Sequence, residues 1–427
     1  MNQVDVTLPP GDRPSVAAAG RVRIPAPLAL LVLANAVSLS GTVITTVAIP
    51  WLVLTTTGSA ALTGITMFVG AGGALIGSML GGRIVQAIGT VRASAGADLT
   101  SGLAVVPLPI LLTLDALHIW QVMVLAAAGT LADAAGSIAR QSLVPAAARC
   151  GGIPRERANA LFTSAEHVGY LLGAPVAGLL IAAVGVSGAL WATVASFVFA
   201  ALLVGQLVRI PPTHDADTHG GHGGLREAVA FIWGDPALRA LVIFPTLSVL
   251  IVGPLAPLVL PVLAREAFGD PLVLGAMVAT FGAGGLLGAG AFGVLGARFS
   301  RRRLYLGIFI VWPIAYAAVT LVPRLPVTLA MLLVLGAAAG CLVPLQATIR
   351  QEHSPQYLLP GIVGLSTATI PVAGPIGVLV TGFLIDSLGL HTTLLGTTAV
   401  ASLIGVTVLA SRTTGLFDAP THAHSRP

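Results

Sequence analysis

Charged residues are scarce in this 427-residue chain, because 9% of its residues are Asp, Glu, Lys or Arg and 56% are hydrophobic. Soluble domains carry about 25% charged residues and cannot hide this much apolar surface from water. The low charge therefore excludes an ordinary soluble protein. The chain also has just 2 cysteines. Cys150 falls in an expected loop and Cys341 in an apolar stretch, so no disulfide framework is expected.

Lysine is absent, so all 21 basic residues are arginine. This bias is typical of a GC-rich genome, and the high pI does not by itself indicate a nucleic-acid partner. The sequence contains neither the DDxxD acid cluster nor the HExxH motif that an intramembrane prenyltransferase or metalloprotease would need. We therefore expect no enzymatic activity and no cofactor.

Histidines and aspartates gather in two polar segments, where they could act as metal ligands. These residues are His214, Asp215, Asp217, His219 and His222 in one segment and His422 and His424 in the other. Neither segment has the apolar residues that would hold ligands rigidly, so we interpret both as flexible and expect no metal site.

Apolar runs of about twenty residues recur along the chain, each near the length that a helix needs to cross about 30 Å of hydrocarbon. Backbone groups in lipid must pair within the segment, which favours helices, and none of the runs alternates as a barrel strand does. The sequence predicts an all-α membrane protein with twelve transmembrane helices in two six-helix bundles. We place the helices at residues 27–55, 59–82, 93–114, 119–139, 158–184, 187–208, 239–263, 271–297, 304–322, 327–347, 361–384 and 391–411.

A polar central segment divides the chain into two halves. Residues 209–238 form a linker whose second part has the apolar face of a helix lying along the membrane surface. The linker separates an N-terminal bundle over 27–208 from a C-terminal bundle over 239–411. Residues 1–26 and 412–427 are expected to be tails.

Arginines are distributed unevenly between the two ends of these helices. All but two of the 21 arginines fall on the side that carries the tails and the linker, and the other side holds Arg265 and Arg324. Because cytosolic loops are enriched in basic residues, we expect both termini to lie in the cytosol of a bacterium, with the chain in the inner membrane.

The two halves share short sequence matches at offsets of 210 to 212 residues. The matches are GAGG at 70–73 and 282–285, residues 82–92 with 293–303, and Arg140-Gln141 with Arg350-Gln351. Paired six-helix repeats are typical of transporters that work by alternating access, with a substrate site between the halves. We therefore interpret the chain as a secondary transporter.

Four stretches give the chain a resemblance to the major facilitator superfamily, in the branch of the enterobactin exporter and macrolide-efflux proteins. They are TTVAIPWLVLTTTGSA at 45–60, RANAL at 157–161, LREAVAFIWGDPALRAL at 225–241 and GPIGVLVTGFLID at 374–386. The resemblance covers nearly the whole chain. It implies proton-driven multidrug efflux by a monomer with no cofactor.

The resemblance also implies a cytosolic gate, built from loop residues and helix ends. The candidates are Gly82, Gly89, Arg92, Asp98, Arg140, Gly293, Arg298, Arg301 and Arg350. The loop signature of the family has an Asp where this chain has Gln86 and Ala297, and many relatives have a helix 1 acid where this chain has Thr42. For Asp98 the alternative is an ion pair with Arg92 or Arg140.

Acids inside apolar helices are candidates for function because burying their charge is costly. We expect Asp133 and Glu166, at comparable depth, to bind the coupling proton or a cationic group of the substrate, together with His167. In the alternative, Asp133 pairs with Arg140 and Glu166 with His167 as structural contacts. Polar stripes at helical spacing are expected to line the cavity, namely Asn35, Ser38, Thr42, Thr45, Thr130, Ser137, Thr163 and Tyr170.

Small residues and prolines mark further helix positions. Gly73 and Gly77, and likewise Gly284 and Gly288, have the spacing that lets two helices approach closely. Pro254 is one of four prolines that should bend the seventh helix.

The predicted helices have few residues that could bind a strongly anionic or a sugar substrate. No arginine is expected deep in the membrane to bind a strongly anionic substrate, and three asparagines in the whole chain supply few hydrogen bonds for a sugar. We therefore expect export of a small amphipathic drug, antibiotic or natural product, with the second half of the chain contributing an apolar wall. A facilitator without proton coupling and a non-transporting membrane sensor remain as alternatives.

Overall fold

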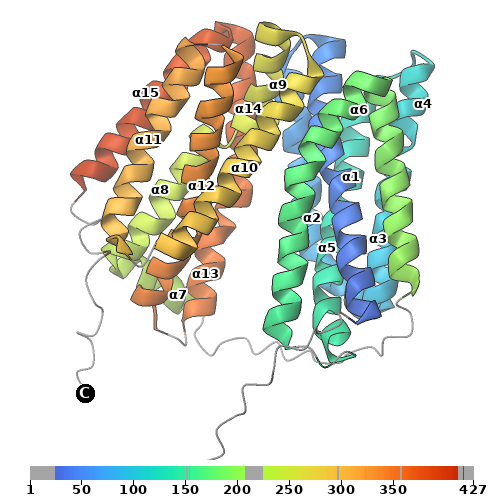
Figure 1. Cartoon of the computed structure of the whole chain (residues 1–427), viewed down its shortest axis with the longest axis horizontal. Coiled ribbons are helices and arrows are strands. Elements are labelled where there is room, and N and C mark those ends of the chain that lie inside the picture. The colour runs from blue at the N-terminus through green and yellow to red at the C-terminus, as the bar shows by residue number, and fades with distance from the viewer. Residues whose placement is uncertain are drawn as a thin grey trace, which may run out of the picture.

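The computed structural model describes residues 25–150, 152, 154–206, 225–295, 298–322, 324–355, 358–411 and 417. All regular secondary structure in this part of the chain is helical, and the helices form two bundles side by side (Figure 1). Most of the predicted tails, most of the linker and the histidine-rich segments lie outside the described residues.

The N-terminal bundle is built from six helical elements. They are α1 (Ala26–Thr57), α2 (Ala60–Ile88), α3 (Thr90–Val105), α4 (Pro107–Thr113), α5 (Ile119–Arg149) and α6 (Arg155–Gly205). Pro107 separates α3 from α4 because proline cannot donate a backbone hydrogen bond. The two elements together make one 24-residue span.

The C-terminal bundle follows the linker helix α7 (Leu225–Gly234). Its elements are α8 (Pro236–Val252), η2 (Leu255–Val259), α9 (Leu260–Leu263), η3 (Ala264–Phe268), α10 (Pro271–Leu295), α11 (Arg301–Leu321), α12 (Leu325–His353), α13 (Leu359–Ala368), α14 (Ile370–Leu388) and α15 (Leu390–Ala410). The elements from α8 to η3 form one 33-residue apolar span that contains two π-helical segments. Within it, the N–H of Val259 bonds to the carbonyl of Pro254, five residues back, which is the wider π-helical turn.

Helix α6 is two membrane spans joined by a sharp turn. Gly185, with φ 73° and ψ 176°, breaks the helical backbone in its middle, a conformation that favours glycine. Gly173 before the turn lies against Val43 of α1, and the side chain of Ser196 after the turn lies against Gly41. Both parts of α6 therefore reach the same level of α1, which requires the chain to reverse direction between them.

Eleven helical segments in the described part of the chain are long and apolar enough to cross a membrane by length and composition. One of them, residues 175–205, contains the reversal at Gly185. Counting α6 as two spans gives the twelve that the sequence predicts.

Glycines let equivalent helices of the two bundles approach closely. Gly73 and Gly77 of α2 lie against backbone atoms of α5, and in the second bundle Gly284 and Gly288 of α10 lie against backbone atoms of α12. These glycines were expected at close helix contacts. Because α2–α5 and α10–α12 are the same pair of helices in the two halves, the packing supports the internal repeat.

The bundles touch near one end of the molecule, which we call the far end and define by the turns at Gly58, Gly185, Gly269 and Gly389. The opposite end, which we call the linker end, holds the turn at Gly89 and the start of α7 (Figure 1). Gly64 of α2 lies against the carbonyl of Val378 in α14, and Gly178 of α6 against Gly275 in α10.

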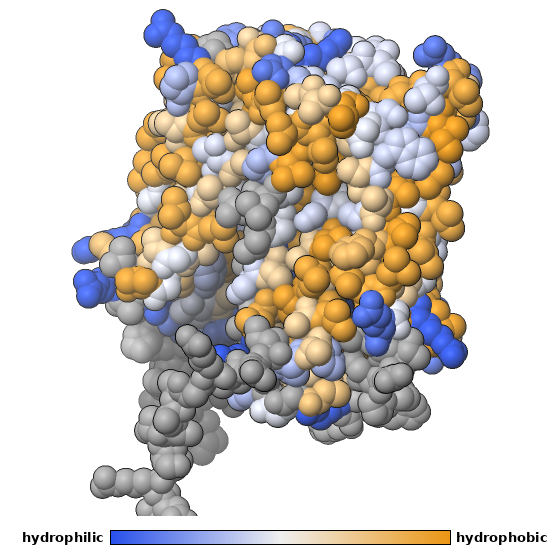
Figure 2. All heavy atoms as spheres, turned by 45° about the vertical axis from the view of Figure 1, so that its right-hand side comes forward, coloured by the Kyte–Doolittle hydropathy of each residue, from blue (hydrophilic) through white to orange (hydrophobic). Residues whose placement is uncertain are grey.

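Apolar side chains cover the flanks of the molecule. Figure 2 shows hydrophobic residues over the side in view and hydrophilic ones gathered toward its two ends. Met79, Leu103 and Val294 are each at least 70% exposed, an exposure that lipid tolerates and water penalises.

Candidate functional site

A buried arginine links two acids inside the N-terminal bundle. Arg140 of α5 donates from Nη1 to Oδ1 of Asp98 in α3 at 2.7 Å and from Nη2 to Oδ1 of Asp133 at 3.4 Å. Its Nε donates to Oδ1 of Asn35 in α1 at 3.1 Å. The alternative in which Asp98 pairs with Arg140 is therefore present, and so is a longer contact between Asp133 and Arg140.

Two hydroxyl groups of α1 complete this network. Ser38 donates to Asp98 at 2.8 Å, and Thr42, one turn further along, donates to Oδ2 of Asp133 at 3.1 Å. Residues 38 and 42 share a face of the helix, so α1 presents one donor to each acid. The side chain of Asp98 is 0% exposed and that of Asp133 is 20% exposed.

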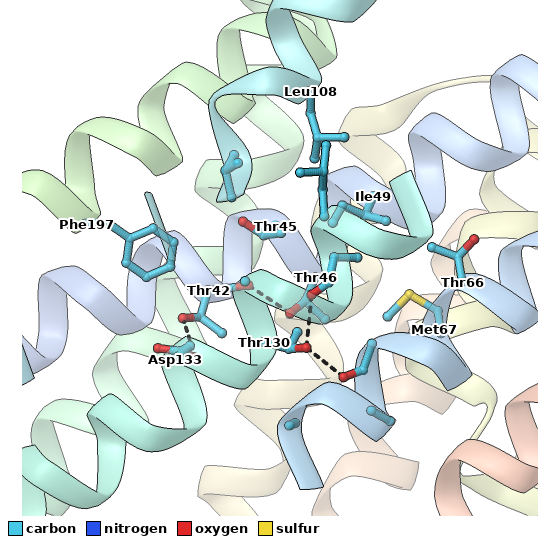
Figure 3. A pocket seen from close by; sticks show the side chains of 17 residues that line it. Thr42, Thr45, Thr46, Ile49, Thr66, Met67, Leu108, Thr130, Asp133 and Phe197 are labelled. Atoms are coloured by element: carbon cyan, nitrogen blue, oxygen red, sulfur yellow. Dashed lines mark hydrogen bonds between the residues drawn. The ribbon is translucent and has the colours of Figure 1, made fainter. Parts of the chain in front are cut away.

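Asp133 is the member of the network that reaches a cavity (Figure 3). The cavity has a volume of about 230 Å³. Its walls are mainly apolar, with five threonine hydroxyls and one carboxylate. The lining residues are Thr42, Thr45, Thr46, Ile49, Thr66, Met67, Gly70, Ala71, Ala74, Val105, Leu108, Leu125, Ala126, Gly129, Thr130, Asp133 and Phe197.

This cavity lies within the first half of the chain. Helices α1, α2 and α5 supply most of its wall, with Phe197 contributed by the second part of α6. The sequence had led us to expect a wall from the second half, but none of the described C-terminal residues lines this cavity. On the α2 side the wall is formed in part by the small residues Gly70, Ala71 and Ala74, which leave room for the cavity.

The predicted cavity-lining stripe on α1 divides into two parts. Thr42 and Thr45 line this cavity. The prediction is wrong for Asn35, which is 4% exposed, and for Ser38, which is 0% exposed. These two side chains point into the buried network because α3 and Arg140 pack over that part of the helix.

Of the other residues predicted to line the cavity, some do and some do not. Thr130 lines the cavity and donates to the carbonyl of Gly70 at 2.6 Å. Ser137 is half-buried and outside the cavity wall, and Thr163 is exposed. The side chains of Tyr170 and His167 lie outside the described residues.

Glu166 does not share the depth of Asp133. Gly169 lies against Leu39 of α1, so Glu166, about one turn earlier in α6, is level with residue 36 of α1. Asp133 is level with Thr42, to which it is bonded. The expectation of comparable depth is wrong, because Glu166 lies between one and two turns nearer the linker end.

The predicted gate residues lie toward the linker end, and the structure brings Asp98 and Arg140 together. Gly89, with φ 84°, ends α2, while Gly82 is exposed. The side chains of Arg92 and Arg298 are exposed, as is Gly293. Arg301 pairs with Glu352 at 3.0 Å. Arg350, the counterpart of Arg140 in the repeat, is 7% exposed.

With both carboxylates ionised, the network is one positive charge short of neutrality. Two carboxylates share one guanidinium, and buried charges need compensation. A proton on either acid would supply the missing charge, and so would a cationic group in the cavity beside Asp133. The two ways of balancing the charge are mutually exclusive, which is the chemistry that an antiporter needs.

Several lining residues were not predicted from the sequence. Thr46, Thr66, Met67 and Phe197 line the cavity, but each is an ordinary residue of an apolar helix. Periodicity alone could not select them. The near-repeat of threonines at positions 42, 45 and 46 was a weak signal, because other apolar helices such as α15 also carry several threonines.

The sequence is similar to those of known membrane transporters. The family model described as Major Facilitator Superfamily matches residues 31–263 and 246–424. Multidrug efflux pump Tap of Mycolicibacterium fortuitum is 31% identical over 387 residues, which cover 89% of this chain and 94% of the relative. Multidrug efflux pump Tap of Mycobacterium tuberculosis is 30% identical over 378 residues, covering 86% and 89%.

Solved structures share the fold at low sequence identity. The nucleoside transporter NupG has a TM-score of 0.72 at 11% identity, covering 90% of this chain and 98% of that one. An inward-facing, unoccupied bacterial homologue of the human lysosomal transporter Spinster has a TM-score of 0.70 at 15% identity, covering 92% and 98%. On the family match and the two relatives, this chain belongs to the major facilitator superfamily, a family of multi-pass membrane transporters and not of enzymes.

Proposed function

We propose that the chain exports small amphipathic compounds, cationic drugs among them, by exchanging them for protons in an alternating-access cycle. The observation that carries the proposal is the cavity whose single carboxylate, Asp133, also belongs to the charge-deficient network with Asp98 and Arg140. The names of the similar Tap proteins, multidrug efflux pumps, support the substrate class.

The cavity wall suits an amphipathic ligand. Thr45, Thr46 and Thr66 offer hydroxyls to polar groups, whereas Met67 and Phe197 offer apolar contact. A volume of about 230 Å³ accommodates part of a drug-sized molecule, and the remainder of such a ligand would extend beyond it. The wall, as far as the structure describes it, contains no basic side chain, which disfavours strongly anionic compounds.

Charge distribution supports an orientation with the linker end in the cytosol. Arg83, Arg92, Arg149 and the run 301–303 lie at the linker end, whereas Arg324 follows α11 at the far end. The positive-inside rule then assigns the linker end, and the two tails with it, to the cytosol of the inner membrane. Because the bundles touch at the far end, this arrangement corresponds to a state that takes up substrate from inside.

Transport into inverted membrane vesicles tests the proposal. Ethidium, a fluorescent amphipathic cation, should accumulate when an acid-inside pH gradient is imposed, and collapse of the gradient should stop the accumulation. Asp133→Asn should abolish gradient-driven accumulation at equal expression. Asp115→Asn is a matched control, because Asp115 is an exposed loop residue at the far end whose positive φ asparagine tolerates.

Each remaining outcome points to a named alternative. Accumulation that ignores the pH gradient and only equilibrates the dye would indicate a facilitator. Binding of the dye without any movement across the membrane would indicate a sensor. If Asp133→Asn and Glu166→Gln both match the unmodified protein, the two acids are structural contacts and the proposed coupling is wrong.

A further inference from the structure

A carboxylate of the C-terminal bundle caps a helix of the N-terminal bundle. Asp386, near the far end of α14, accepts from the backbone N–H of Ala60 at 2.7 Å and from that of Ala61 at 3.0 Å. The hydroxyl of Ser59 donates a short hydrogen bond to the same carboxylate. Three donors at the start of α2 thus bond to one carboxylate, which lies 325 to 327 residues later in the sequence.

The start of α2 already has a cap of its own. The Oγ atom of Ser59 accepts from the N–H of Leu62 at 3.0 Å, the usual role of a serine before a helix. Asp386 takes donors that would otherwise bond to water, and its charge suits the positive end of the helix dipole. The contact with Asp386 is therefore not needed for α2 to form, and its distinctive effect is to join the two bundles.

The cap stands at the rim of an apolar seal between the bundles. Six residues, drawn from both halves and each at most 5% exposed, pack together: Leu54, Ala60, Leu258, Val262, Val378 and Ile385. Gly382 of α14 lies directly against the carbonyl of Ala60. The main chains of α2 and α14 thus touch one turn from Asp386, with the carboxylate on the exposed side of the contact.

We propose that Asp386 is a latch: its contacts with the start of α2 hold the far end of the transporter closed, and they break when that end opens. Opening requires the start of α2 to leave α14. When it does, water replaces the carboxylate at Ala60 and Ala61 while Ser59 keeps α2 capped, so that the latch can open and close repeatedly without loss of helix structure. The inference concerns the closed and open populations and does not depend on the identity of the substrate.

Thiol labelling in lipid nanodiscs, where both faces meet the reagent, tests the latch. The background carries Cys150→Ser and Cys341→Ala, and Val262→Cys places one thiol in the seal, at a position that is 1% exposed. A maleimide should label this thiol slowly when Asp386 is present. Asp386→Ala should raise the labelling rate about tenfold by shifting the closed-to-open equilibrium. Asp386→Asn, which keeps an acceptor oxygen, should give a smaller increase.

Asp270→Ala is the matched control for these variants. Asp270 is also a carboxylate at the far end, but it bonds to the N–H of Leu272 at the start of α10, within its own bundle. Its removal should leave the labelling rate unchanged. If Asp386→Ala elutes as aggregate on size exclusion, the labelling rate of the nearly isosteric Asp386→Asn is compared with the control instead. The latch is overturned if no well-folded Asp386 variant labels faster than Asp270→Ala.

Discussion

Arg140 lies closer to Asp98 than to Asp133, with its Nη1 atom 2.7 Å from one carboxylate and its Nη2 atom 3.4 Å from the other. The shorter contact is sealed from water, since the two side chains are 3% and 0% exposed. The longer contact leads to the cavity. In the proposed mechanism, Asp98 holds Arg140 in place and Asp133 exchanges its partner.

Asp98→Asn should destabilise the protein strongly. The change weakens the short, buried contact that holds Arg140 and leaves its guanidinium with Asp133 at 3.4 Å as its one carboxylate partner. A hydrogen bond to a charged group contributes about 1.5–3 kcal/mol to the free energy of unfolding. Thermal aggregation of the detergent-solubilised protein, followed by size exclusion, would show a lowered midpoint. The double variant Asp98→Asn with Arg140→Gln removes both charges and should recover part of the loss. A single variant as stable as the unmodified protein would contradict this role for Asp98.

Thr42→Val should impair transport with little effect on folding. The change preserves side-chain shape and removes the 3.1 Å hydrogen bond to Asp133. A hydrogen bond to an ionised group contributes about 1.5–3 kcal/mol, so the initial rate of ethidium transport should fall at least about tenfold. Thr55→Val is the control, because Thr55 bonds to the backbone of its own helix. Equal rates for the two variants would refute the assignment.

Two glycines of α2 should respond differently to the same substitution: Gly77→Ala should lower the thermal midpoint, whereas Gly72→Ala should not. Gly77→Ala would place a methyl group against the backbone of Leu131, and the helices must then separate. Gly72 has nothing within 4 Å of such a methyl group, so Gly72→Ala should be neutral or stabilise by about 0.5–1 kcal/mol. Thermal midpoints of the two variants measure the difference. Similar midpoints would show that the close contact between α2 and α5 is not required.

Helix positions and small-residue contacts could be predicted from the sequence, because they depend on local composition. The length of the apolar runs located the spans, and glycine spacing located the α2–α5 contact. Gly185 separates two spans that have almost no polar residues between them, and the reversal there was expected from the gap between residues 184 and 187.

Contacts between distant segments could not be predicted in the same way. Periodicity placed Asn35, Ser38 and Thr42 on one stripe of α1, but it does not say that α3 covers the first two and leaves the third at the cavity. The partner of Asp386 is more than 320 residues away, and no local pattern identifies it. The relative depth of Asp133 and Glu166 also depends on how α5 and α6 are offset against α1.

Release of protons on substrate binding tests the central claim most directly, namely that a proton and a cation compete for the network of Asp98, Arg140 and Asp133. Tetraphenylphosphonium would be added near neutral pH to the purified protein in weakly buffered detergent solution, with pH and binding recorded together. We predict release of about one proton per bound cation, and none from Asp133→Asn. Binding to the unmodified protein without release, or undiminished release from the variant, would contradict the account.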